Sequence, residues 1–236
     1  MNLLEIKRDL NKSALALLLY VLSVQILAVL LVLLLPLTKI PLLSDQYICM
    51  VISVIISYCL LDNIFPKETV TEPSPEKPSF SVLSFLHYFM LFQAAQWIGG
   101  IINIPIITLF TKLGLNLSFS EEAARGGSLT NAPMLFYTIL VAPLMEELVF
   151  RGIFYRRFRS YGKYFAAFYT AFFFALMHSN FLQFAPAFSM GMILFFIRDR
   201  YGLPYSILLH FSNNLLAIVV NLSLIHISEP TRLLSI

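Results

Sequence analysis

The sequence predicts an all-α protein, a polytopic transmembrane bundle of about seven to eight helices with an active site within the membrane. Three observations carry this prediction. Of the 236 residues, 58% are hydrophobic and only 12% are charged, whereas soluble domains have about 25% charged residues. The mean hydropathy is +0.80. The apolar runs are long and continuous rather than alternating, which favours helices over strands. The net charge of +3 is small and forms no basic patch, so the expected surroundings are a lipid bilayer and not nucleic acid.

Each candidate span is close to the ~20 residues that a helix needs to cross a bilayer. The first is too long for the apolar region of a signal peptide, about 7–15 residues, and no small-x-small cleavage site follows it, so we expect it to be retained. The segment 103–111 is short and contains Pro105, and it either extends the third span or re-enters the membrane. In chain order the seven spans are 13–35, 42–61, 80–102, 132–155, 163–179, 181–197 and 203–221.

Two polar segments interrupt the apolar runs. Residues 66–78 are rich in proline and charge, and we expect a solvated linker there. Residues 112–131 read as a polar loop that can hold a short interfacial helix. These boundaries predict N-terminal helices and loops over 1–129 and a catalytic core over 130–221.

The C-terminal tail, 222–236, resembles the conceptual translation of an adapter used in sequencing-library preparation. We therefore expect a non-native tail, with the native sequence ending near Asn221 and with no function for His226.

Positive charge gathers at one end of the expected bundle. If the spans alternate in direction, the chain start, the loop at 151–163 and the loop at 198–200 lie on one side, and all three carry Lys or Arg. The loops 36–41 and 180–181 lie on the other side and are nearly free of positive charge. By the positive-inside rule we expect a multi-pass cell-membrane protein with a cytoplasmic N-terminus.

The clearest functional signal is the stretch Glu146-Glu147-Leu148-Val149-Phe150-Arg151, which lies inside the fourth span. A charge near the bilayer centre costs roughly 2.5–3.5 kcal/mol on insertion scales, so an ionisable cluster there indicates a functional site. Glu147 and Arg151 are four residues apart and can pair on one helix face. Glu146 points about 100° away from Glu147, toward a different neighbour.

Two further pairs have the same spacing of four residues, Phe174 with His178 and His210 with Asn214. Glu146 and His178 both lie roughly 21–26 Å from the expected turn at 160–162, at 1.5 Å per residue. His210 and Asn214 lie roughly 12–18 Å from the next turn. We therefore expect the four polar residues in one layer, if the first hairpin projects further from the membrane.

The residue types fit hydrolysis. A carboxylate beside an imidazole can deprotonate water, which is the role we expect for Glu146 and His178. Arg151 can hold Glu147 ionised while Glu146 titrates. His210 and Asn214 present N–H donors that suit a developing oxyanion.

Simpler interpretations stay open for each residue. Glu147 and Arg151 can be a structural ion pair, and a single intramembrane histidine is often a helix–helix hydrogen bonder. Phe174 can wall the site or only pack, and we interpret His87, in the third span, as structural.

The three motifs EExxxR, FxxxH and HxxxN, in this order on successive spans, resemble the CPBP family of CAAX prenyl proteases and bacteriocin-processing (Abi-type) enzymes. The resemblance covers about 130–220 and implies an intramembrane endopeptidase. It implies that Glu146 and His178 activate the water and that His210 and Asn214 stabilise the oxyanion. It also implies that neighbouring side chains support the site, namely Glu147, Arg151 and Phe174.

Metal dependence is open, because such enzymes have been described both as metalloproteases and as metal-free glutamate peptidases. We expect no cofactor; a zinc ion, if present, would use Glu146, His178 and His210. The chain has no HExxH motif, which argues against a zincin, and no GxSxG motif.

The expected partners are a peptide or membrane-protein substrate and the lipid bilayer, and we expect the protein to be bacterial. Two other functions stay open. One is a non-catalytic bacteriocin-immunity or scaffold protein of the same fold, and the other is a small transporter that uses the buried carboxylates.

Overall fold

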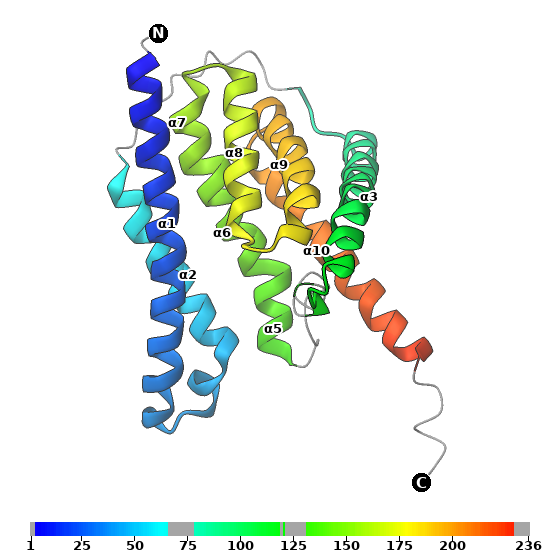
Figure 1. Cartoon of the computed structure of the whole chain (residues 1–236). Helices are drawn as coiled ribbons and strands as arrows, with labels where there is room; N and C mark the ends of the chain where they lie inside the picture. The colour runs from blue at the N-terminus through cyan, green and yellow to red at the C-terminus, as the bar shows by residue number, and fades with distance from the viewer. Residues whose placement is uncertain (1–2, 66–77, 119, 121–130, 229–236) are drawn as a thin grey trace.

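The computed structural model describes residues 3–65, 78–118, 120 and 131–228. All regular elements among these residues are helices, which confirms the all-α bundle (Figure 1). The α-helices used below are α1 (Leu3–Leu34), α2 (Gln46–Ile64), α3 (Val82–Lys112), α5 (Ala132–Phe136), α6 (Ala142–Glu147), α7 (Tyr155–Arg159), α8 (Lys163–Met177), α9 (Phe181–Tyr201) and α10 (Leu203–Ser228).

Six helical segments within the described residues are long and apolar enough to cross a membrane. The first runs over Leu3–Thr38 and so begins ten residues before the expected span. The segment 103–111 extends α3, because the helix continues through Pro105 to Lys112. The expected fifth span corresponds to α8, which has only 15 residues. That is shorter than the ~20 residues of a typical span, although α8 runs the depth of the bundle beside α9 (Figure 1).

Three expected segments reach beyond the described residues. They are most of the linker at 66–78, the middle of the loop at 112–131, and the end of the tail at 222–236. Helix α10 itself continues to Ser228, past the point near Asn221 where we expected the native sequence to end.

The centre of the bundle is one continuous helix over Ala132–Arg159, in which two π-helical segments separate α5, α6 and α7. The π segments are Tyr137–Val141 and Leu148–Phe154, and the two glutamates lie between them. Helices α1 and α2 pack together on one side of this helix, while α8, α9 and α3 follow on the other (Figure 1). Pro143 has no N–H to donate to the turn before it, and that turn is the wider π segment.

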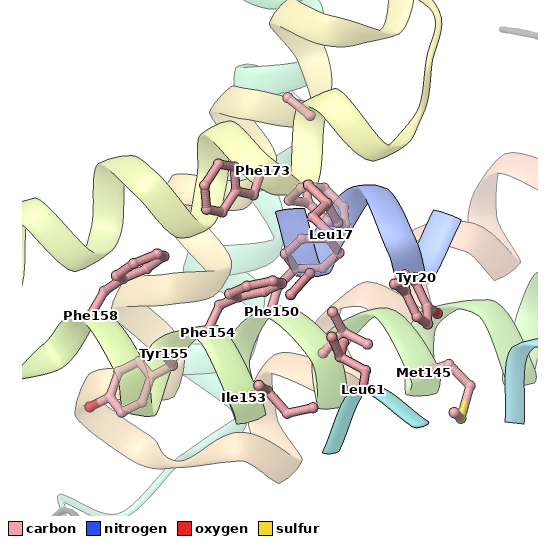
Figure 2. Packing of buried hydrophobic residues seen from close by; sticks show 14 of the residues in the cluster. Leu17, Tyr20, Leu61, Met145, Phe150, Ile153, Phe154, Tyr155, Phe158 and Phe173 are labelled. Carbon is pink, nitrogen blue, oxygen red and sulfur yellow. The ribbon is translucent and has the colours of Figure 1, made fainter. Parts of the chain in front are cut away.

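An aromatic ladder fixes how the central helix is rotated about its axis. Phe150, Phe154 and Phe158 recur every four residues and stack with ring centroids 5.7 and 6.1 Å apart. Phe173 of α8 packs against two of these rings, and Leu17 of α1 belongs to the same core (Figure 2). Arg151 and Glu147 are thereby turned toward Gly191 of α9 and His210 of α10.

Ion pairs join the helices at the end of the bundle where α1 begins and α7 turns into α8 (Figure 1). Arg157 lies 2.6 Å from Asp9 of α1. Asp199 of α9 forms ion pairs with both Arg159, at 2.8 Å, and Lys163, at 3.0 Å. These are the basic positions from which a cytoplasmic end was expected, and that orientation stays a prediction.

Candidate active site

A buried ion pair lies at the centre of the bundle. Arg151 Nη1 is 3.1 Å from Glu147 Oε1, and both side chains are 0% exposed. Arg151 Nη2 also donates to the backbone carbonyl of Gly191, at 2.9 Å. The guanidinium carbon lies 4.6 Å from the centre of the Phe174 ring. A carboxylate, a carbonyl and an aromatic face therefore surround the charge of this desolvated cation, while Arg151 Nε has no hydrogen-bond partner among the described residues.

Gly191 permits this arrangement because α9 passes very close to α8. A Cβ atom at this position would lie 2.9 Å from Ala171 Cα and 3.3 Å from Arg151 Nη2. Any larger residue would push α9 away from α8 and move the carbonyl that Arg151 binds. The contact is an example of small residues allowing close helix approach in a membrane protein.

His210 bridges the two glutamates. Its Nδ1 lies 3.1 Å from Glu147 Oε1, and its Nε2 lies 3.7 Å from Glu146 Oε2. The His210 side chain is 4% exposed. Since a carboxylate only accepts, Nδ1 carries the proton that is directed at Glu147. Nε2, on the side of Glu146, is then an acceptor in the neutral ring and a donor in the imidazolium.

His178 is held by its own helix. Its Nδ1 lies 2.9 Å from the carbonyl oxygen of Phe174, one turn earlier. A carbonyl only accepts, so this contact assigns the proton to Nδ1 and leaves the lone pair of the neutral ring on Nε2. Helix α8 ends at Met177, and Ser179 adopts a left-handed conformation with φ 51°. His178 therefore lies at the helix terminus and carries a nitrogen that can accept a proton.

Glu146 and His178 line the same cavity of about 190 Å³. Helices α1 and α2 supply the facing wall, which includes Tyr20, Gln25 and Val54. Glu146 is 20% exposed, in contrast to the fully buried Glu147. The two adjacent carboxylates thus face different surroundings, one a cavity and the other an ion pair.

Asn214 lies in a polar network between α10 and its neighbours. Its amide donates to the Thr138 carbonyl at 3.0 Å, and its oxygen lies 3.4 Å from the amide nitrogen of Asn213. The Asn213 oxygen accepts from Gln93 at 3.0 Å and from Gln96 at 2.6 Å. The sequence analysis did not identify Gln93, Gln96 or Asn213. Two glutamines three residues apart in an apolar run nevertheless indicate a helix–helix contact.

The residues expected at the site are only partly brought together. Glu146 and His178 share the cavity, and His210 contacts the glutamate pair. Asn214 is directed at Thr138, and neither it nor His210 is among the described residues that line the cavity.

A preformed metal centre does not fit these residues. Across the described ranges, no group of three or more His, Cys, Asp or Glu side chains is arranged to hold a metal ion. The set expected from the sequence, Glu146, His178 and His210, is therefore not a ready three-ligand site.

Comparison with known proteins supports the motif-based resemblance. Residues 128–216 match the profile of a family described as Rce1-like type II CAAX prenyl endopeptidases. The match contains all three motifs and leaves α1, α2 and α3 outside it. No curated protein and no solved structure matches the chain.

Proposed function

We propose that this chain, whose residues 128–216 belong with the Rce1-like type II CAAX prenyl endopeptidases, hydrolyses a peptide bond of a membrane-associated protein or peptide within the membrane. One observation carries the proposal. Glu146 and His178 line one cavity, while the adjacent Glu147 pairs with Arg151 and contacts His210. The arrangement separates a carboxylate that can exchange protons from one that is held in an ion pair.

In the proposed reaction, a water molecule in the cavity gives a proton to Glu146 and donates its second O–H to His178 Nε2. The water oxygen bonds to the carbonyl carbon, and the π electrons of the carbonyl move to its oxygen. When the oxyanion collapses, the C–N bond breaks. Glu146 returns its proton to the leaving nitrogen, so the enzyme ends the cycle in its starting state.

The other polar residues have supporting parts in this proposal. Glu147 and Arg151 join the central helix to α10 and α9, and their charges neutralise each other away from the cavity. The oxyanion role implied for His210 requires its imidazolium form, with Nε2 donating on the side of Glu146. Asn214 would have to exchange its bond to Thr138 for one to the oxyanion.

We propose that the substrate is a peptide or membrane protein reached from the basic end of the bundle, which we place in the cytoplasm. The family description is that of a CAAX prenyl endopeptidase. For a chain that we expect to be bacterial, the substrate class is better defined by an unbiased search than by that name.

The test is a comparison of protein N-termini in membranes from cells that express wild type or Glu146→Gln. The substitution keeps the shape of Glu146 and removes its basic carboxylate. Glu5→Gln, at the exposed start of α1, is the matched control. We expect a set of N-termini that wild type and Glu5→Gln produce and that Glu146→Gln does not.

Identical sets of N-termini would refute the peptidase. Two further measurements then decide between the other functions. Protection against a bacteriocin that survives Glu146→Gln would favour the immunity or scaffold protein. Ion- or pH-coupled flux in proteoliposomes would favour the transporter.

A further inference from the structure

We propose that the phenol groups of Tyr20 and Tyr137 donate hydrogen bonds to the scissile carbonyl oxygen of a substrate bound beside Glu146 and His178. The inference rests on the proposed endopeptidase function. It assigns a catalytic group to α1, a helix that lies outside the segment matched by the family profile.

The two tyrosines lie on the cavity that holds the expected water-activating pair. Tyr20 comes from α1 and is 5% exposed, and Tyr137 begins the π segment ahead of Glu146. Both line the cavity with Glu146 and His178. Glu146 is near enough to interact electrostatically with each phenol, and Tyr137 interacts in the same way with Tyr20. Figure 2 shows Tyr20 reaching from α1 to the helix that carries Met145.

Neither phenol oxygen has a hydrogen-bond partner among the described residues. In the part of the chain that the structure describes, no hydrogen bond joins the hydroxyl of Tyr20 or Tyr137 to another residue. Other tyrosines of this bundle do bond: Tyr155 donates to Asp199 at 2.9 Å, and Tyr161 donates to Asp9. Tyr20 is buried and Tyr137 is partly buried, and both line the cavity. Each therefore keeps an O–H donor that a ligand bound in the cavity can accept from.

The proposed reaction also needs hydrogen-bond donors beside the carbonyl oxygen of the substrate. Negative charge develops on the carbonyl oxygen when water adds, and each preorganised donor there stabilises the transition state. Asn214 is bonded to Thr138, and His210 directs Nδ1 at Glu147. The phenols are on the cavity itself. Each would keep its proton while donating, so the balance of the proposed reaction does not change.

The test uses Tyr20→Phe and Tyr137→Phe, which remove only the hydroxyl. Tyr47→Phe is the matched control, because Tyr47 contacts the Tyr137 ring at 6.4 Å but does not line this cavity. The probe is a synthetic peptide that spans a cleavage site found in the comparison of N-termini. We expect kcat to fall by about 10²–10³ for each cavity variant, the usual effect of losing one oxyanion donor, with KM little changed.

Wild-type kcat in both cavity variants would overturn the inference. So would an increase in KM at constant kcat, because it would mean that the hydroxyls bind the ground state and transition state equally. A melting temperature equal to that of Tyr47→Phe confirms that a loss of kcat is not a folding defect. Glu146→Gln is measured in parallel. If it cleaves at the wild-type rate, the proposed function itself fails; if it is inactive while the tyrosine variants are fully active, only this inference fails.

Discussion

Replacing Arg151 with methionine should destabilise the protein by about 3–5 kcal/mol, the usual cost of removing one partner from a buried ion pair. Both side chains of the pair are 0% exposed, so no water reaches the carboxylate that is left behind. The substitution also leaves the Gly191 carbonyl without its 2.9 Å donor. Methionine refills most of the volume against Phe174, which limits the free-energy cost of the cavity that the substitution leaves. The losses share one site and do not add fully.

The assay is thermal unfolding in detergent, followed with a thiol-reactive dye. Cys49 is 0% exposed and reports unfolding, while the exposed Cys59 is replaced by alanine in every variant. At about 2–4 °C per kcal/mol, the scaling for soluble domains of this size, Arg151→Met should melt about 6–20 °C lower.

Arg156→Met is the matched control. Arg156 pairs with Asp62 at 3.7 Å, with side chains 36% and 24% exposed, and such a pair contributes about 0–1 kcal/mol. Adding Glu147→Gln to Arg151→Met should recover part of the loss, since it removes the uncompensated charge. Equal melting temperatures for Arg151→Met and Arg156→Met would refute the reasoning.

Three further outcomes are expected. Gly191→Ala should cost about 1–3 kcal/mol through overpacking against Ala171, whereas Gly100→Ala, with no atom within 4 Å of its Cβ, should melt like wild type; equal shifts in the same assay would contradict this. Asn213→Leu should cost about 1–3 kcal/mol, because Gln93 and Gln96 lose their shared acceptor, and unchanged melting would show that the network is not needed. Cleavage should survive exhaustive chelation with no metal found by elemental analysis, and activity that returns only with added zinc would contradict the metal-free reaction.

Hydropathy located the helices well but not their ends. The first apolar run predicted a start at residue 13, yet α1 begins at Leu3. Its first turns carry charge, and Asp9 pairs with Arg157 across the bundle. A hydropathy pattern identifies the part of a helix that lipid covers, whereas the rest depends on contacts that no local pattern contains. Pro105 left the segment 103–111 ambiguous for a similar reason, since a proline removes one hydrogen bond but does not always end a helix.

Spacing predicted the contacts within one helix, and it could not predict those between helices. Glu147 and Arg151 pair because four residues bring them to one face. Which carboxylate His210 would approach depends on the rotation of α10. Contacts of α10 with other helices, including the one between Asn213 and Gln93, help to fix that rotation. Neither the bond from Asn214 to Thr138 nor the place of Tyr20 on the cavity could be derived from a single segment.

The structure divides the candidate site between two parts of the chain. The matched segment supplies the charges, because Glu146 and His178 both lie within 128–216. The opposite wall of their cavity comes from α1 and α2, through side chains such as Tyr20 and Val54. Under the proposed function, a peptide bound in this cavity would contact both walls. We therefore expect chains that share the three motifs to share a reaction, and to differ in substrate according to the helices that precede the motifs. For this protein, residues of α1 and α2 are where a change of specificity should be sought.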